Sequence, residues 1–526
     1  MNGAGRAAVA VLLAAAALSS SEARAQTTNV PNGFRDSIVV SGIDFPVGIA
    51  FLPDGRLLFN EQIVGRIRLV VNGALMATPV VTIPDVRGAL FSEQGLLGIA
   101  VDPDWPIRPY VYVHYDRLDS TRIRIARFTV MGDLWFTGDG SLTIDPASRH
   151  DILNDIPDLS SIHNGGSVRF GPDKHLYVSI GEDGSTPCAA QDSVTFRGVI
   201  LRLDVSGLPA GPGGPPFKSE ITPPDNPFVT HPNENARLVW AMGLRNPFRC
   251  FIDPANGDLF IGDVGASTWD EINWLPTSSS GSNFGWPLLE GPAPHMSCPN
   301  PGSNFRAPIY YYDTGSTSAV IGAIPYRRGA TAGPAAFPVE YEGDVFLCDY
   351  YFGFLRRLHR TGDTWAVAAP VPGQVNSTTW GSGYLAVSDF AIAPDGALWY
   401  SRQHDGSVGR STGMLRRLAY NPPVGVPPPP PPTSVRFLAP YPSPGRGSVT
   451  LPFSLATTSH VVLRIYDARG RLVRRLLDAT LSPGVIPNEA LWDGRSDDGD
   501  RVGSGLFFAR LTVDGVEMTR RFPLLP

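Results

Sequence analysis

Stretches in which hydrophobic and polar residues alternate recur along the first 420 residues of the chain. In each, an apolar-x-apolar stretch leads into a turn built on Pro-Asp-Gly or a variant of it, and a second alternating stretch follows. Alternation with a period of two is typical of a strand with one buried face, and proline with glycine or asparagine favours a tight turn. The pattern predicts six β-hairpins, at residues 49–59, 99–113, 168–178, 251–260, 323–347 and 390–399.

A third strand is expected after each hairpin, because a further alternating stretch follows every copy. These stretches lie at residues 65–69, 123–128, 198–203, 270–274, 353–358 and 414–418. Six copies spaced about 50 to 85 residues apart are typical of four-stranded blades joined by loops of variable length. The sequence therefore predicts an all-β chain with a six-bladed β-propeller over residues 30–421. A sandwich of unrelated hairpins is the alternative.

The composition changes sharply after the last repeat. Pro427–Pro432 is a run of six prolines, which favours a stiff, extended linker over residues 422–433. Residues 434–526 then return to short alternating strands separated by glycine and aspartate turns. This pattern predicts a small immunoglobulin-like β-sandwich as a second domain.

Composition and charge narrow the class of protein. The 526 residues include 56 glycines and 51 prolines, too many for a helical bundle, and the 43% hydrophobic content excludes wholesale disorder. The net charge is −6, with no dense cluster of basic residues, so nucleic acid is not an expected partner. Lys174 and Lys218 are the only lysines in the chain.

The N-terminus has the features of a secretory signal. Arg6 precedes the apolar stretch 7–18, and Ala23-Arg24-Ala25 resembles a cleavage site, so residues 1–25 are predicted to be a signal peptide. The apolar stretch is too short to span a bilayer, and we expect no transmembrane segment. The predicted location is the periplasm, the cell surface or the medium.

The four cysteines permit three disulfide pairings if the protein is exported. Cys188 and Cys298 lie in stretches rich in glycine and proline, whereas Cys250 and Cys348 lie in predicted strands. A bond between the two loop cysteines is therefore favoured.

Propeller geometry places the residues that precede each innermost strand at one mouth of the channel. The second strand of each blade runs back to the same mouth. The residues before the inner strands are Asp44-Phe45, Glu93-Gln94, His163-Asn164, Arg245-Asn246, Thr317-Ser318 and Ser388-Asp389, and the second strands add Glu61, Asp116, Glu182-Asp183, Asp263, Asp349-Tyr350-Tyr351 and Arg402-Gln403-His404. Histidine, arginine and carboxylates that converge on a concave mouth predict a functional site there.

Two parts of this mouth suggest particular chemistry. His163 precedes two glycines that let a ligand approach the backbone, and it is suited to act as a general base beside the cation Arg245. The loop 262–266, with Asp270 and Glu271 after it, offers oxygen atoms suited to calcium.

The same stretches resemble the soluble PQQ-dependent sugar dehydrogenases, the glucose/sorbosone and aldose sugar dehydrogenases. The similar segments follow one another in family order at residues 93–100, 163–166, 171–173, 181–184, 243–247, 270–273 and 283–287. The C-terminal segments 466–471, 492–494 and 503–508 resemble FlgD-like immunoglobulin domains appended to exported bacterial proteins. The second domain is therefore expected to serve in attachment to the cell surface rather than in catalysis.

The resemblance implies a role for each site residue. His163 would take the proton of the sugar's anomeric hydroxyl while hydride passes to PQQ, and Arg245 would stabilise the reduced quinone. The cofactor would be bordered by Glu93, Gln94, Asn246, Thr317 and Tyr351. The backbone carbonyls of Gly265 and Ala266 would hold calcium beside PQQ, and Asp270 and Glu271 would hold a second, structural calcium ion.

The last two blades depart from the family. A cofactor-binding lysine of the glucose enzymes is replaced here by Tyr351, and arginines before the sixth inner strand are replaced by Ala386 and Ser388. Lys174 and Lys218 are not placed to substitute. Possible compensating cations are Arg402, Arg327 and Arg328.

The sequence thus predicts an exported quinoprotein that oxidises aldoses to lactones and passes electrons to an external acceptor. The altered cofactor positions keep open a second interpretation, a calcium-stabilised propeller without catalysis that binds glycan or protein. A calcium-dependent lactonase on the same scaffold is a third.

Overall fold

The computed structural model describes residues 28–525, with gaps at 300–301, 315–316, 329–332, 334, 407–409, 422–434, 439, 441–444, 456 and 482–487. The predicted signal peptide and linker lie outside the described residues. The chain divides into two compact units, residues 1–421 and 422–526. Both consist of β-strands with a few short helical turns, so the all-β prediction is confirmed.

Six antiparallel sheets of four or five strands, with one further two-stranded hairpin, make up the described part of the first unit. The first two contain β2 (Pro46–Phe51), β3 (Leu57–Glu61), β4 (Arg66–Val71), β5 (Ala74–Leu75) and β6 (Val81–Thr82), and β7 (Leu96–Val101), β8 (Tyr110–Asp116), β9 (Arg122–Gly132), β10 (Leu142–Ile144) and β11 (His150–Pro157). The third contains β12 (Val168–Phe170), β13 (Leu176–Ile180), β14 (Val199–Leu203) and β15 (Val239–Met242), and the fourth β16 (Pro247–Ile252), β17 (Leu259–Asp263), β18 (Trp269–Leu275) and β21 (Tyr310–Asp313).

The last two sheets follow the same plan. The fifth contains β22 (Val320–Pro325), β23 (Val345–Asp349), β24 (Phe354–Thr361), β25 (Thr364–Val367) and β26 (Gly381–Ser382). The sixth contains β27 (Val387–Ile392), β28 (Leu398–Arg402), β29 (Gly413–Tyr420) and β1 (Phe34–Ile43). Each predicted hairpin supplies the first two strands of one sheet, and each predicted third strand lies next to them.

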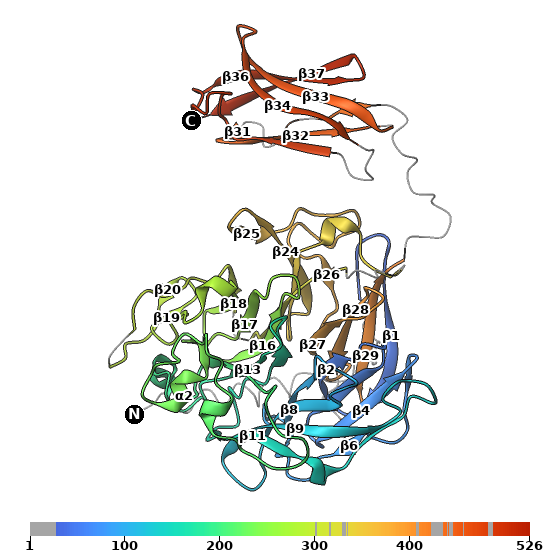
Figure 1. Ribbon diagram of the computed structural model, residues 1–526, viewed down its shortest axis with the longest axis vertical. Helices are drawn as coiled ribbons and strands as arrows, with labels where there is room; N and C mark the ends of the chain where they lie inside the picture. Colours follow the sequence, from blue (N-terminus) through green and yellow to red (C-terminus); the bar gives the residue numbers. More distant parts are fainter. Residues whose placement is uncertain are drawn as a thin grey trace, which may run out of the picture. The chain divides into compact units, whose positions relative to one another are not determined.

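The first strands of the sheets contact one another in chain order. β2 contacts β7, and the series continues through β12, β16, β22 and β27, which in turn contacts β2 (Figure 1). Large apolar side chains fill the space between successive sheets: Ile125 of the second sheet, for example, belongs to one buried cluster with Val178 and Leu201 of the third. The loops that enter the first strands are therefore brought together although they are far apart in the sequence.

The sixth sheet is completed by the beginning of the chain. β1 pairs with β29 in an antiparallel register that runs from Phe34↔Tyr420 to Ile43↔Gly413. The repeat pattern did not predict this strand, because β1 stands alone before the first hairpin and its outer position leaves much of it partly exposed. The pairing ties the two ends of the unit together.

No described helix is long and apolar enough to cross a membrane.

The second unit holds two sheets around one hydrophobic core. One contains β30 (Arg436–Phe437), β32 (Val449–Ser454) and β35 (Asn488–Trp492), and the other β31 (Gly445–Arg446), β37 (Val516–Leu525), β36 (Gly505–Val513), β33 (Ser459–Asp467) and β34 (Leu472–Leu481). Trp492 is fully buried against Phe507 and Phe522. The immunoglobulin-like and FlgD-like assignments stay predictions.

The predicted bond between the two loop cysteines is confirmed. Cys188 and Cys298 form a disulfide that joins the loop after β13 to the loop that follows the short hairpin β19 (Leu289–Glu290) and β20 (Ala293–Pro294). Cys250 and Cys348 are free and buried in their strands.

Candidate functional site

Carboxylates at the ends of second strands hold the loops that enter the first strands. Each accepts backbone N–H groups from its own sheet's entry loop. The bonds are Asp44 N to Glu61 (3.0 Å), Gly95 N to Asp116 (2.8 Å), Asn246 N to Asp263 (2.7 Å) and Ala319 N to Asp349 (3.1 Å), while in the third sheet Asp183 accepts from Leu159 and Ser160 (2.8 Å each). These carboxylates, gathered at the predicted mouth, are therefore structural.

The imidazole of His163 is held by a carboxylate two residues after the end of β13. Its Nδ1 lies 2.6 Å from Oε1 of the buried Glu182, so Nδ1 carries the proton and Nε2 presents the lone pair. Nε2 has no hydrogen bond with any described residue. Glycine is required at 181, because a Cβ there would lie 2.0 Å from the carbonyl oxygen of His163. Glu182 was placed at the mouth by the sequence, but its role as the histidine's partner was not predicted.

Glu93 and Asn246 fix the backbone around His163. One oxygen of Glu93 accepts the His163 N–H at 2.7 Å and the Asn246 side-chain amide at 3.0 Å. The amide oxygen of Asn246 accepts the N–H of Gly165 at 3.1 Å. Loops of the second, third and fourth sheets therefore meet at His163.

Arg245 lies on the same loop as Asn246. Its carbonyl accepts the N–H of Glu182 at 2.8 Å, and its guanidinium donates to the Val264 carbonyl at 2.9 Å and packs 5.5 Å from the Trp286 ring. Burial lowers the pKa of Arg245, while the negative charges of Glu182 and other nearby carboxylates oppose the shift. Glu182 thus contacts both the His163 ring and the Arg245 backbone, and the catalytic roles of His163 and Arg245 stay predictions.

The loop with the predicted calcium ligands is shaped by an acid that the sequence did not reveal. Oε1 of Glu290 accepts the N–H groups of Ala266 and Ser267, each at 2.7 Å, and Gly265 N donates to Asp270 at 2.7 Å. Burial acts to raise the pKa of Glu290, but these backbone donors lower it. The carbonyls of Gly265 and Ala266 accept no hydrogen bond from any described residue, and oxygen atoms of this kind suit calcium.

Asp270 and Glu271 point to opposite faces of β18, because neighbouring side chains of a strand alternate. Asp270 accepts from the Tyr312 hydroxyl at 3.2 Å, and burial raises its pKa to about 6. Glu271 lies opposite Asp263 of β17, and burial and that charge raise its pKa to about 8. Within the described ranges, no three His, Cys, Asp or Glu residues are grouped to hold a metal ion. The side chains of Asp270 and Glu271 do not converge on one point. The second calcium site stays a prediction.

The other three residues predicted to border the cofactor, Tyr351, Thr317 and Gln94, differ in how exposed they are. Tyr351 is 55% exposed, and desolvation by surrounding atoms and the charges of Glu93 and Asp349 raise its pKa. Thr317 is exposed. Gln94 is buried and donates to Asp158 at 2.7 Å, the same carboxylate that accepts from Asn164.

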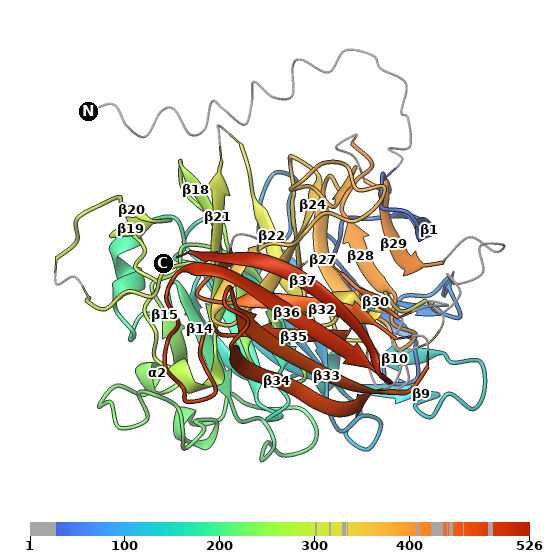
Figure 2. The same cartoon turned by 90° about the horizontal axis from the view of Figure 1, so that it is seen from above.

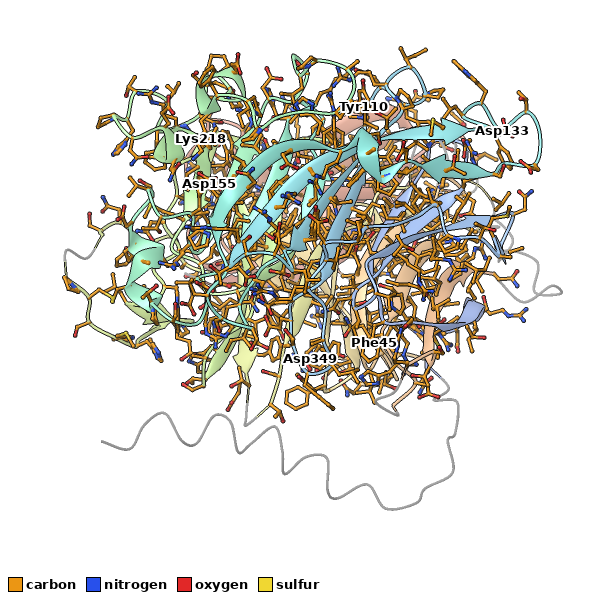
Figure 3. All side chains as sticks on the ribbon, turned by 90° about the horizontal axis from the view of Figure 1, so that it is seen from below. Phe45, Tyr110, Asp133, Asp155, Lys218 and Asp349 are labelled. Atoms are coloured by element: carbon orange, nitrogen blue, oxygen red, sulfur yellow. A yellow bond between two sulfur atoms is a disulfide. The ribbon has the colours of Figure 1, made fainter. Side chains whose placement is uncertain are left out.

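A chain of neutral groups extends along the fifth, sixth and first sheets. The Tyr350 hydroxyl donates to Gln403 (2.8 Å) and lies 3.2 Å from His404 Nε2; Gln403 then donates to Gln62 (2.6 Å), and Gln62 to the Glu93 carbonyl (3.1 Å). Phe45 packs near His404, and Figure 3 shows Phe45 and Asp349 toward the same end of the unit. The sequence did not predict Gln62, which lacks any motif.

The placement of Ser388 before the sixth inner strand is wrong. β27 begins at Val387, so Ser388 and Asp389 lie inside the strand and are fully buried. Ser388 donates to the Pro46 carbonyl at 2.8 Å, and Asp389 binds Arg169 at 2.6 Å. The strand begins earlier than predicted because its alternation continues through these polar residues.

Arg402 breaks the pattern of carboxylates at the ends of second strands. It ends β28, is 1% exposed, and its Nε and Nη2 have no hydrogen-bond partner among the described residues. Burial lowers its pKa, and burial and the Arg402 charge lower the pKa of His404. Arg327, in contrast, is paired with Asp253 and Glu342, and the Arg328 N–H binds Glu342 at 2.9 Å.

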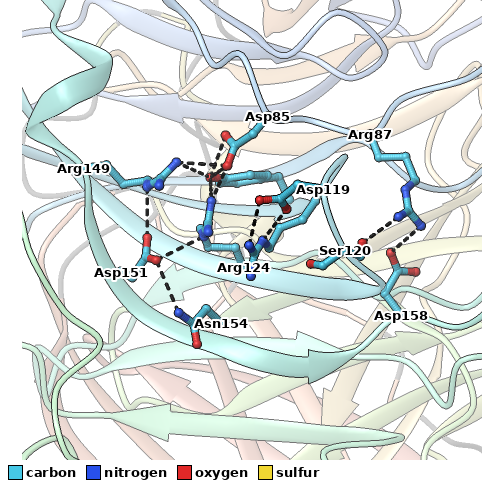
Figure 4. A network of polar contacts seen from close by, with 11 residues as sticks. Asp85, Arg87, Asp119, Ser120, Arg124, Arg149, Asp151, Asn154 and Asp158 are labelled. Carbon is cyan, nitrogen blue, oxygen red and sulfur yellow. Dashed lines mark hydrogen bonds and ion pairs between the residues drawn. The ribbon is translucent and has the colours of Figure 1, made fainter.

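A separate polar network supports the site from the second sheet (Figure 4). Arg149 binds Asp85 at 3.0 Å and Asp151 at 3.1 Å. Nearby, Arg87 reaches Asp158 at 3.5 Å, and Asp158 accepts the amide of Asn164 at 3.1 Å, next to His163. The bond between Asp158 and Asn164 connects the second sheet to the loop of His163.

Comparison with known proteins identifies the family. The family model "Glucose / Sorbosone dehydrogenase" matches residues 43–410, so the chain belongs to the glucose/sorbosone dehydrogenase family. The chain is similar to quinoprotein glucose dehydrogenase B of Acinetobacter calcoaceticus (25% identity; 49% of this chain, 53% of the relative) and to aldose sugar dehydrogenase YliI of Escherichia coli (29%; 47% and 60%). It thus spans less than two thirds of these relatives.

Solved structures give the same result for the fold. The PQQ-bound aldose sugar dehydrogenase of Streptomyces coelicolor superposes with a TM-score of 0.51 at 27% identity, over 74% of this chain and 99% of that one. An oxidoreductase (glucose dehydrogenase) of Thermus thermophilus gives 0.55 at 28%, over 73% and 99%.

Proposed function

We propose that the chain is an exported quinoprotein that oxidises aldoses at the anomeric carbon to lactones, with its six sheets as the blades of a β-propeller. The observation that carries the proposal is the His163–Glu182 pair, joined through Glu93 and Asn246 to the loop of Arg245. A base held by a carboxylate beside a buried cation is the arrangement that removal of a hydroxyl proton requires.

His163 acts through Nε2, which is free to accept the proton of the anomeric hydroxyl. Glu182 keeps the ring in the required tautomer and stabilises the imidazolium that forms. Arg245 supplies positive charge where negative charge develops. When bound, PQQ would supply the hydride acceptor that the oxidation needs, with an external acceptor to take the electrons.

The residues present fit PQQ and calcium in part. The free carbonyls of Gly265 and Ala266 would hold calcium, and Glu93, Gln94, Asn246, Thr317 and Tyr351 would border the cofactor. PQQ carries carboxylates that need cationic partners. Of the three candidate cations, Arg402 has two guanidinium nitrogens without a hydrogen-bond partner among the described residues, and we propose it for this role.

The proposal is tested by reduction of a redox dye when an aldose is added to protein supplied with PQQ and calcium. We expect turnover by the wild type, roughly a thousandfold loss in His163→Ala, and no change in His460→Ala, which alters an exposed histidine of the second unit. Failure of every sugar in a broad panel, although PQQ is bound, would remove the dehydrogenase assignment.

A second candidate function is supported by the altered fifth and sixth sheets. Tyr351 replaces a lysine of the glucose enzymes, and the chain is also similar to human Hedgehog-interacting protein (27% identity over 42% of this chain), which is named for binding. In this case the unit is a calcium-stabilised propeller that binds glycan or protein. PQQ that leaves the melting temperature unchanged, even far above micromolar concentration, would favour it.

A further inference from the structure

The outer face of the larger C-terminal sheet carries a row of arginines. β34, β33, β36 and β37 lie side by side in this sheet (Figure 2). Arg464 of β33 is directly opposite Arg475 of β34 on one side and Arg510 of β36 on the other. Arg521 of β37 is diagonal to Arg510, since Thr519 is the direct partner of Arg510. We call these four residues the arginine row.

All four side chains point away from the core. Leu463, Ile465, Ala509 and Leu511, which alternate with them along β33 and β36, are fully buried, whereas every member of the row is exposed. Among the described residues, the guanidinium groups of Arg464, Arg475 and Arg521 have no hydrogen-bond or ion-pair partner. Arg510 is 3.8 Å from Glu517, beyond hydrogen-bond distance. Glu517 and, opposite Val462, Asp478 lie on the same face, so the row presents an excess of positive charge that is partly opposed.

The arginine row should cost the sheet stability, because like charges directly opposite one another destabilise a sheet. Residues 435–526 hold 12 arginines and no lysine, against seven aspartates and two glutamates, although the whole chain is acidic. The row is not visible as a run in the sequence, because its members are 11 to 35 residues apart. Only the strand register brings them together.

Two aromatic rings lie beside the row on the same face. Tyr466 is the direct cross-strand partner of Phe508, and the Arg510 guanidinium lies 4.9 Å from the Tyr466 ring. Flat rings next to guanidinium groups offer both an apolar surface and planar forks that match carboxylates. A partner that engages the row must present acidic groups at several points along one direction.

We propose that this face binds an acidic polysaccharide, a polymer whose carboxylated sugar rings lie across the row and against Tyr466 and Phe508. The charge of the row is complementary to such a polymer. The other unit of the chain belongs to a family of sugar oxidoreductases, which favours a glycan over a nucleic acid. The inference does not depend on PQQ or on turnover.

The test measures binding of the full chain to immobilised polygalacturonate, with neutral dextran as the control surface. We expect binding to polygalacturonate alone, weakening as sodium chloride is raised. Arg464→Gln/Arg510→Gln should weaken it roughly tenfold or more, whereas Arg501→Gln, an exposed arginine outside the row, should stay within about twofold. The melting temperature of the double variant should not fall, because its repulsion is relieved.

Three results would overturn the proposal. The first is that the wild type does not bind polygalacturonate, and the second is that the double variant and Arg501→Gln bind it equally well. The third is that single-stranded DNA binds more tightly than polygalacturonate and depends on the same arginines. In the last case the partner is a nucleic acid.

Discussion

Two sides of the candidate site are built in different ways. On the base side, formed by His163, Glu182, Glu93, Asn246 and Arg245, the carboxylates of Glu182 and Glu93 contact the His163 ring, the His163 N–H and the Asn246 amide at 2.6 to 3.0 Å. On the aromatic side, formed by Tyr350, Tyr351, Gln403, His404 and Arg402, the hydrogen-bonded groups are neutral and the buried cation has two nitrogens without partners among the described residues.

The difference separates chemistry from binding. The base side contains what proton removal needs, and its geometry is held by carboxylates from neighbouring sheets. The aromatic side would determine which anionic ligand is held and how tightly. Changes on the base side should therefore affect turnover at constant cofactor binding, and changes on the aromatic side should do the reverse.

Among the residues around His163, the largest effect is expected for Glu182. Glu182→Gln keeps the size of the side chain but removes the charge that stabilises the imidazolium, so kcat should fall about a hundredfold while PQQ affinity changes little. Steady-state kinetics and a PQQ titration on the same protein check this. A fall in affinity that accounts for the whole loss would place Glu182 in binding instead.

Removal of Arg402 should weaken binding of the cofactor rather than slow the reaction. Arg402→Met loses a charged hydrogen bond of about 1.5–3 kcal/mol, so PQQ should bind at least about tenfold more weakly. The melting temperature of the protein without cofactor should hold or rise, because buried donors without partners are removed. Unchanged PQQ affinity in a folded variant would exclude Arg402 from the cofactor site.

Tyr351→Lys should act in the opposite direction. A lysine at this position would supply the cation that the resemblance to the glucose enzymes assigns there, and PQQ should bind about tenfold more tightly. Phe352→Lys, at a neighbouring exposed position, is the matched control and should have a smaller effect. Equal gains from both lysines would indicate general attraction of charge rather than a defined contact.

The smallest effect is expected from His404. An anion bound nearby favours the charged imidazole, so binding takes up protons and PQQ affinity should rise a few-fold as the pH falls. Because burial and Arg402 lower the pKa of His404, the rise should lie below its ordinary value of 6.5. Isothermal titration at several pH values would show the slope in the wild type and its loss in His404→Gln. An unchanged slope in that variant would exclude His404.

The sequence predicted the parts of the fold that depend on local alternation. The first two strands of every sheet and the strands after them lie where the repeats predicted. β1 was missed because its pairing with β29 joins the two ends of the unit and has no local signal. The loop disulfide followed from composition alone.

For the site, the sequence placed His163, Arg245 and Glu93 together, since entry loops of successive sheets converge. It did not distinguish carboxylates that hold loops from Glu182, which holds the imidazole, because both kinds end a strand. It also missed Glu290 and Gln62, whose roles depend on loop conformation. Ser388 was misplaced because a buried polar residue inside a strand resembles a loop residue in sequence.

One measurement tests the central claim most directly: the absorption spectrum of PQQ bound to the calcium-loaded protein, followed after an aldose is added without dye. The account predicts that the wild type reduces the cofactor, and that His163→Gln binds PQQ equally well but leaves it oxidised on the same timescale. No spectral change in the wild type with any aldose, or equal reduction in His163→Gln, would contradict it.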